Sequence, residues 1–207
     1  MKILKDTKSK LGNKIELLGC DKFKPVLIIG VFHGDEPQGD FLIKEYLKLN
    51  QISEMLFIPC LNPDGMSLNQ RQNSNGVDLN RNFPTKNWEK VIDKTFYGGE
   101  KPNSEIETKF MVEIIEEYKP QLILTLHAPF CTVNFDGDAL KYAEKISEII
   151  NYPVQEDIGY PTPGSFGTDC GVERNIPTIT LELDENIDVK RLINPVHKIF
   201  DYINSVI

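Results

Sequence analysis

The chain has 207 residues, of which 40% are hydrophobic and 26% are charged, and its formal net charge is −8 at pH 7. This length and composition fit a globular protein with one substantial core, so we expect residues 1–207 to form a single domain. The acidic balance and the lack of a basic stripe argue against nucleic acid or an anionic membrane surface as a partner.

The N-terminal stretch Met1–Gly19 carries scattered charges and lacks the apolar run of a signal peptide. No other segment is apolar over a length that crosses a bilayer. We therefore expect a cytoplasmic protein. The four cysteines are widely spaced and form no CxxC pair, which predicts reduced thiols.

Apolar runs typical of buried strands alternate with helical patterns along the chain. The expected strands are 24–32, 54–61, 121–127 and 178–183. The expected helices are 40–49, 104–118, 138–151 and a last helix that starts at Asn194 with Pro195 in its first turn. Ser104 and Glu107 have the spacing of a capping box.

This alternation predicts an α/β fold with three layers, α/β/α, around a mixed, largely parallel central sheet. In such sheets ligands bind beyond the carboxyl ends of the strands. Functional residues are therefore expected at the ends of the strands.

Two expected strands end in histidines that fit a metal site. The first runs into "VFHGDEPQGD", which places His33 and Glu36 three residues apart, and the third ends in His127. Two imidazoles and one carboxylate, with a fourth position open to water, are the ligand set of a catalytic zinc. The alternative is that these histidines are hydrogen-bonded core residues. His197 has no acidic partner at chelating spacing, and we expect it to be structural or on the surface.

A carboxylate interrupts the last apolar strand. Glu182 lies between Leu181 and Leu183, and burying it is costly unless it has a partner or a function. A zinc site needs a general base, and Glu182 is the candidate. Because Glu182 shares a face with Thr180 and Asp184, a polar sheet edge is the alternative.

The stretch "NGVDLNRNFP" (75–84) places Arg81 directly after Asn80. A planar guanidinium binds a carboxylate through two parallel hydrogen bonds, and a neighbouring amide adds a donor. The alternatives are a solvated loop or a structural salt bridge to one of the many acids.

Several blocks of the sequence resemble the zinc carboxypeptidases of the carboxypeptidase A type. "HGDE", "NPDG", "NGVDLNRNFP", a strand-end histidine and a strand-borne glutamate follow in the same order over about Val26 to Asn186. Within that family, "NPDGMSLNQRQNSNGVDLNRNFPTKNW", "GGEKPNSEIET" and "GYPTPGSFGTDCG" are similar to the murein tripeptide amidase branch. That branch splits the γ-D-glutamyl–meso-diaminopimelate bond of recycled cell-wall peptide.

The resemblance implies one Zn²⁺ per chain, held by His33, Glu36 and His127. Glu182 matches the family's general base and acid. Asp78 falls where the family has a carboxylate that orients the first zinc histidine, a common way to fix an imidazole tautomer.

The resemblance also implies roles in substrate binding. Arg71 matches the arginine that polarises the scissile carbonyl, and Asn80 and Arg81 match the pair that grips the terminal carboxylate. Tyr160 is near the family's mobile tyrosine, which closes over the substrate. Asp169, in the same loop, is a candidate partner for the side-chain ammonium of diaminopimelate, with a solvated loop acid as the alternative.

The chain departs from the murein amidase pattern in two places. Ala128 follows the third zinc ligand, where that pattern has an acid, and the segment between Trp88 and Tyr97 is short. We expect Ala128 to affect substrate selection. We expect the short segment between Trp88 and Tyr97 to open the rim of the pocket.

The resulting functional hypothesis is a zinc-dependent peptidase for small peptides with a free carboxylate. Two alternatives remain open: a zinc-dependent N-acyl amino acid deacylase like aspartoacylase and succinylglutamate desuccinylase, and a non-catalytic peptide-binding module. The oligomeric state is left open by the sequence.

Overall fold

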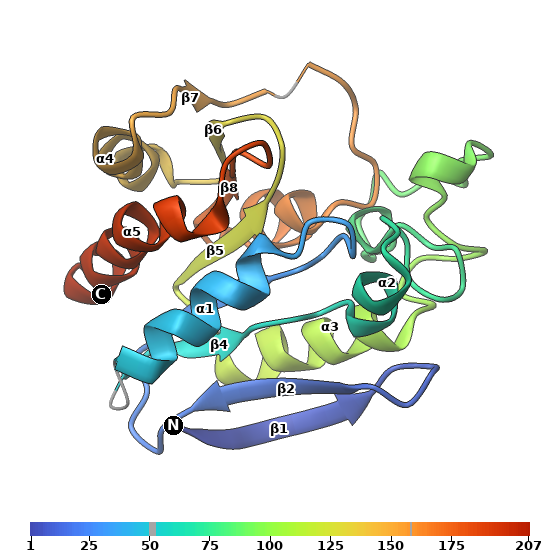
Figure 1. The fold of residues 1–207 in the computed structure, drawn as a ribbon. Helices are drawn as coiled ribbons and strands as arrows, with labels where there is room; N and C mark the ends of the chain where they lie inside the picture. Colours follow the sequence, from blue (N-terminus) through green and yellow to red (C-terminus); the bar gives the residue numbers. More distant parts are fainter. Residues whose placement is uncertain (50–52, 158) are drawn as a thin grey trace.

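The computed structural model describes residues 1–49, 53–157 and 159–207. Over these residues the chain builds an eight-stranded sheet in the order β1-β2-β4-β3-β5-β8-β6-β7 (Figure 1). Its strands are β1 (Lys2–Lys8), β2 (Lys14–Gly19), β3 (Val26–Gly30), β4 (Leu56–Ile58), β5 (Leu122–His127), β6 (Thr132–Asp136), β7 (Val154–Gln155) and β8 (Thr178–Glu182).

The centre of the sheet is parallel and its flanks are mixed. β4, β3, β5 and β8 are parallel neighbours, and each lies within one of the four apolar runs recognised in the sequence. β2 is antiparallel to β4, and β6 is antiparallel to β8. The expected α/β fold with a mixed, largely parallel sheet is confirmed.

Five α-helices lie within the described residues. They are α1 (Gln38–Leu49), α2 (Pro63–Leu68), α3 (Ile106–Tyr118), α4 (Leu140–Ile150) and α5 (Ile193–Ser205). The other helical segments are η1 (Leu79–Arg81), η2 (Lys94–Phe96), η3 (Thr168–Glu173), which is a π-helix, and η4 (Val189–Leu192).

The alternation of side chains along β3 and β5 divides the core into two layers. Ile28 and Leu124 point into the cluster formed with α1, α4 and α5. Leu27 and Ile123 point the other way, into the cluster formed with α3. Figure 1 shows α1 next to α5 on one side of the sheet. Helices therefore cover both faces, which gives the three expected layers.

All four expected helix starts differ from the structure by one or two residues, and two of the differences have a visible cause. α3 begins at Ile106 with Glu105 as its N-cap residue and without a side-chain cap, so the capping-box expectation is wrong. The hydroxyl of Ser104 donates instead to the carboxylate of Glu105, and Glu107 is buried. α5 begins at Ile193, directly after η4, although Pro195 does lie in its first turn.

None of the helices in the described ranges has the length and apolar character needed to cross a membrane. All four cysteines are free thiols in the structure.

Candidate active site

The loop after β3 carries two of the three expected zinc ligands. Gly34 lies so close to α2 that a Cβ atom there would come within 1.9 Å of the Gly65 backbone, and its N–H donates to the carbonyl of Arg71 at 3.2 Å. This close approach holds the neighbouring His33 and Glu36 at the carboxyl end of the sheet.

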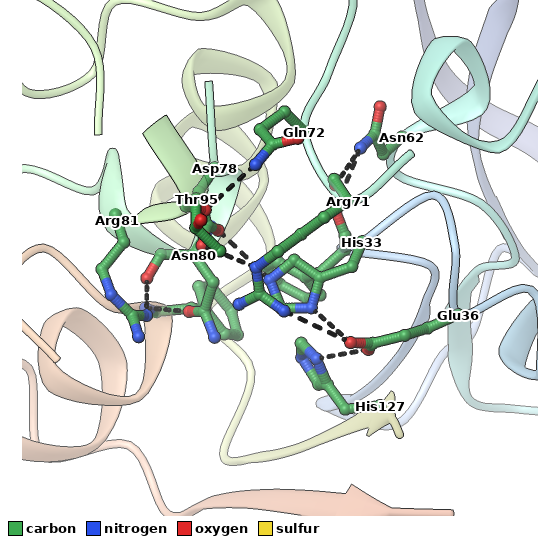
Figure 2. Close-up of polar contacts among 12 residues, drawn as sticks. His33, Glu36, Asn62, Arg71, Gln72, Asp78, Asn80, Arg81, Thr95 and His127 are labelled. Atoms are coloured by element: carbon green, nitrogen blue, oxygen red, sulfur yellow. Dashed lines mark hydrogen bonds and ion pairs between the residues drawn. The ribbon is translucent and has the colours of Figure 1, made fainter. Parts of the chain in front are cut away.

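His33, Glu36 and His127 meet at one point in the structure. Nδ1 of His33 lies 2.8 Å from Oε1 of Glu36, and Nδ1 of His127 lies 3.1 Å from Oε2 of the same carboxylate. The three residues are buried, and each offers one ligand atom within 4.8 Å of the others. Figure 2 shows both imidazoles directed at the Glu36 carboxylate. Residues from β5 and from the loop after β3 thus converge as the parallel sheet predicts.

The donor set fits zinc. Nε2 of His33 lies 3.1 Å from Oδ1 of Asp78, which is fully buried and accepts as a carboxylate. The Nε2 proton therefore points at Asp78, and the Nδ1 lone pair is left for a metal. Two imidazole nitrogens and one carboxylate oxygen are ligands that Zn²⁺ prefers.

The charges at this point favour a cation. Burial lowers the pKa of His33, but the carboxylates of Glu36 and Asp78 outweigh burial and raise this pKa to about 9. Burial alone would raise the pKa of Glu36, yet the two histidines hold it well below its usual range. A positive charge is therefore stabilised here, and a divalent ion supplies it when bound.

Glu182 lies beside the histidines at the end of β8. It is the register partner of His127 on β5 and is only 7% exposed. Its Oε2 has no hydrogen-bond partner among the described residues. Burial raises the pKa of Glu182, and Glu36 adds to the increase, while His127 opposes it. A buried carboxylate with a raised pKa and a free oxygen is suited to accept and return a proton.

Asp78 also contacts Arg71. Nε of Arg71 donates to Oδ2 of Asp78 at 3.0 Å, and Nη1 lies 3.5 Å from Oε1 of Glu36. The guanidinium is thus held next to the proposed metal ligands while it still lines the pocket.

Arg81 is buried, and no carboxylate in the described part of the chain forms an ion pair with it. It is 3% exposed, and its Nη1 donates to the carbonyl of Asn80 at 2.7 Å. Its guanidinium also interacts with the side chain of Tyr160. No acid of the described residues lies within ion-pair distance of Arg81, so the structural salt bridge considered from the sequence is not observed there. A buried arginine charge without such a partner is destabilising unless an anion binds to it, for example the carboxylate of a ligand.

Asn80 is oriented by the loop that follows Tyr160. Its Oδ1 accepts from the N–H of Phe166 at 2.9 Å, which turns its amide nitrogen away from that loop. Figure 2 shows Asn80 beside Arg81. The two side chains thus form a donor pair in one wall of the pocket.

All of these side chains except Asp78 line a single cavity of about 220 Å³. The cavity wall also contains Phe96, whose ring centroid lies 5.7 Å from the guanidinium carbon of Arg71 and 5.5 Å from that of Arg81. Phe96 belongs to the short segment 88–97, which forms a wall of the pocket. Phe96 could not be identified from the sequence, because an aromatic residue between polar ones carries no chemical motif.

Asp169 and His197 lie away from this cavity. Nε of Arg174 donates to Oδ2 of Asp169 at 3.0 Å, and this acid is 2% exposed. The expectation that Asp169 meets a substrate ammonium is therefore wrong, because its charge is already paired inside the protein. His197 is structural, as expected: its Nε2 contacts the carbonyl of Leu42 at 3.1 Å and its ring packs on Tyr46.

Comparison with known proteins identifies the class of this site. The sequence model of the zinc carboxypeptidases matches residues 21–141. The chain therefore belongs to the zinc carboxypeptidase family and is a metallopeptidase whose cofactor is zinc. The resemblance to this family seen in the sequence is confirmed.

Within the family, the chain is similar to murein peptide amidases. Murein peptide amidase A of Escherichia coli (strain K12) is 32% identical over 170 residues, which are 75% of this chain and 69% of that protein. The Vibrio campbellii protein of the same name is 35% identical over 177 residues, which are 76% of this chain and 68% of that protein. The crystal structure of murein-tripeptide amidase from Escherichia coli O157 has a TM-score of 0.83 at 26% identity, with 95% of this chain and 89% of that chain covered.

Proposed function

We propose that this metallopeptidase hydrolyses the C-terminal amide bond of small murein peptides, namely the bond between γ-D-glutamate and meso-diaminopimelate. The names of the similar proteins support the substrate class. The observation that carries the proposal is Arg81, a buried arginine that has no carboxylate of the described residues within ion-pair distance, in the cavity that also contains His33, Glu36 and His127. We further propose that the enzyme works in the cytoplasm, in the recycling of cell-wall peptides.

Arg81 and Asn80 bind the free carboxylate of the peptide. The guanidinium and the Asn80 amide supply donors on one side of the cavity, and the metal ligands lie on another. Fixing the terminal carboxylate selects the last amide bond for attack. Tyr160, which is 39% exposed and bonds to Arg81, covers the bound residue from the solvent side.

His33, Glu36 and His127 hold one zinc ion, and Asp78 fixes the tautomer of His33. Zinc bound there supplies Lewis acidity and lowers the pKa of water. Glu182 takes a proton from the attacking water and later delivers it to the leaving amine. The raised pKa of Glu182 suits it to both steps.

Arg71 stabilises the charge that develops on the carbonyl oxygen. Its guanidinium is held by Asp78 before substrate arrives, so little reorganisation is needed during the reaction. Because Phe96 packs against both guanidinium groups, it keeps Arg71 and Arg81 in separate positions in the cavity.

Peptide hydrolysis fits this chain better than the two alternatives. The similar proteins are named murein peptide amidases, which favours the peptidase over an N-acyl amino acid deacylase. A binding module that had lost catalysis would have lost ligands, whereas the three ligands and Glu182 are all present.

The test is hydrolysis of L-Ala-γ-D-Glu-meso-diaminopimelate by the zinc-loaded protein, alongside a panel of N-acyl amino acids. We expect release of free diaminopimelate. The variant Glu182→Gln is expected to lower kcat by about 10²- to 10⁴-fold, because it removes the proton acceptor while it keeps the zinc ligands.

Glu185→Gln is the matched control, since it makes the same change at an exposed acid three residues along the chain. It should leave kcat unchanged. A wild type that carries zinc but ignores every carboxyl-terminal peptide would overturn the proposed function, and full activity in Glu182→Gln would remove Glu182 from the mechanism.

A further inference from the structure

The side chain of Asn62 lies between the loop after β3 and the segment that carries Arg71. Asn62 is the N-cap residue of α2 and is fully buried. Its Oδ1 accepts from the N–H of Gly65 at 2.9 Å. Its Nδ2 donates to the carbonyl of Phe32 at 3.2 Å and to the carbonyl of Arg71 at 3.3 Å, and Figure 2 shows this amide directed at Arg71. Asn62 therefore does more than cap α2, because it connects two segments of the candidate active site.

The loop after β3 has an unusual backbone conformation just before the first proposed zinc ligand. Val31 has a φ of 55°, in the left-handed region that a β-branched residue rarely adopts. Such a conformation persists only where the surrounding contacts enforce it. Asn62 supplies two of these contacts, because its backbone N–H donates to the carbonyl of Val31 at 2.9 Å and its side-chain amide donates to that of Phe32. Asn62 is thus firmly attached to the backbone that leads into His33.

The carbonyl of Arg71 accepts two hydrogen bonds from this part of the site. One comes from the Asn62 amide, and the other comes from the N–H of Gly34 at 3.2 Å. The packing around these bonds is tight: a Cβ atom at Gly65 would come within 2.5 Å of both Nδ2 of Asn62 and the carbonyl oxygen of Gln72. The position of the Arg71 backbone is therefore set by the loop after β3.

The segment from Arg71 to Asp78 is attached to the loop after β3 at both of its ends. At one end, Oδ1 of Asp78 lies 3.1 Å from Nε2 of His33. At the other end, the attachment is the Arg71 carbonyl. Without this second attachment, the Arg71 end could shift relative to the proposed zinc ligands, and its guanidinium would shift with it.

A shift of this kind affects the chemical step. A donor stabilises a developing oxyanion only when it is already held at the right distance, and a misplacement of about 1 Å can lower the rate about 10²-fold. Binding of the terminal carboxylate is a separate matter. Within the described residues, the hydrogen bonds of the Asn62 side chain do not involve Asn80 or Arg81.

We propose that Asn62 is a positioning residue for Arg71: through the Arg71 carbonyl, its side-chain amide fixes the guanidinium relative to the loop that carries His33 and Glu36. This inference rests on the proposed function and deepens it. It adds to the mechanism a residue that touches neither the substrate nor the zinc ion. It also gives a role to the first residue of the block "NPDG".

The test uses two variants that keep a cap on α2 but lose the amide donors. Asn62→Ser retains a hydroxyl acceptor for the N–H of Gly65, and Asn62→Asp retains Oδ1 in a side chain of the same size. We expect each variant to lower kcat for L-Ala-γ-D-Glu-meso-diaminopimelate by about 10-fold or more and to leave KM within about threefold, because Arg71 acts on the transition state. Zinc affinity should stay within about threefold of wild type, because Asp78 still orients His33.

The background variant Arg71→Ala separates positioning from a general structural role. In that background, Asn62→Ser should lower kcat by less than about threefold, because the residue through which Asn62 acts is absent. Ser67→Ala is the matched control: it removes a hydrogen bond within α2, from Oγ of Ser67 to the carbonyl of Asp64 at 2.8 Å, and should leave kcat unchanged. Circular dichroism checks that each variant is folded. An equal loss of kcat from Asn62→Ser in both backgrounds would overturn the inference, as would wild-type kcat in folded Asn62→Ser.

Hydrogen exchange measured by NMR tests the inference without a substrate. The N–H of Gly34 donates to the same Arg71 carbonyl, and the N–H of Ile28, in the centre of the sheet, reports global unfolding. We expect Asn62→Ser to speed exchange at Gly34 about tenfold relative to Ile28. If wild type cleaves no peptide, the proposed function fails, yet this faster exchange would still support the attachment of Arg71 by Asn62. An unchanged ratio of the two exchange rates would refute that attachment.

Discussion

Asp78 joins the proposed metal site to the proposed oxyanion site. One carboxylate oxygen accepts from His33 and the other accepts from Arg71. The side chain is fully buried, and burial alone would raise its pKa, but His33 and Arg71 hold that pKa well below its usual range. Asp78 is therefore ionised, and its two carboxylate oxygens can hold the His33 imidazole and the Arg71 guanidinium in position.

Replacing Asp78 by alanine should weaken zinc binding by about 10- to 100-fold, because His33 loses the acceptor that sets its tautomer and orientation. Zinc affinity is measured by competition with a chromogenic chelator. Asp35→Ala is the control, since Asp35 is an exposed acid in the same loop as His33. A zinc affinity within threefold of wild type in Asp78→Ala would show that His33 is oriented by other contacts.

Residues that end apolar strands were the ones that sequence could identify. His127 and Glu182 stand at the ends of β5 and β8, and neighbouring parallel strands bring such positions together. Whether Arg81 forms a salt bridge could not be predicted, because the sequence does not tell which of the 31 acidic residues lie near it.

At the scale of elements, the N-terminal hairpin was not expected. β1 is largely exposed and rich in lysine, so it lacks the apolar run by which the central strands were recognised. β6 was missed because alternate residues, such as Asn134 and Asp136, are polar and line a cavity on one face of the sheet. The expected capping box does not form, because the backbone N–H groups of Ser104 and Glu105 donate to Oδ1 of Asn82 instead.

Asn82 connects η1 to the segment that leads into α3. Its amide nitrogen donates to the carbonyls of Gly98 and Lys101, and its oxygen also accepts from the hydroxyl of Thr108. The side chain is fully buried. It therefore fixes the start of α3 next to Arg81.

Asn82→Ala should lower the free energy of unfolding by about 2 to 4 kcal/mol, because several buried donors and acceptors lose their partner at once. Urea denaturation followed by circular dichroism measures the change. Asn186→Ala, at an exposed asparagine after β8, serves as the control and should cost less than about 0.5 kcal/mol. A similarly small loss in Asn82→Ala would mean that water replaces these hydrogen bonds.

At the scale of the whole molecule, the three layers followed from the order of strands and helices. Continuous apolar runs such as 26–30 and 122–126 are buried on both faces, which is typical of parallel strands covered by helices. The flanks of the sheet could not be deduced in this way. Their strands have one polar face, and in the case of β6 that face belongs to a cavity.

Zinc should stabilise the whole fold. Its proposed ligands come from the loop after β3 and from the end of β5, and the ion offsets the buried carboxylate between the two imidazoles. Free zinc at about a thousand times its dissociation constant adds about 4 kcal/mol to the free energy of unfolding. For a chain of this size that corresponds to a rise of about 8 to 16 °C in Tm.

Differential scanning calorimetry of the chelator-treated protein, with and without added zinc, measures this shift. Glu182→Gln keeps the three ligands, so its Tm should rise with zinc as in wild type. Glu36→Gln removes the charged ligand, and most of the rise should disappear. Because Glu36 is the residue that both histidines contact, a full zinc shift in Glu36→Gln would mean that the ion binds elsewhere in the protein.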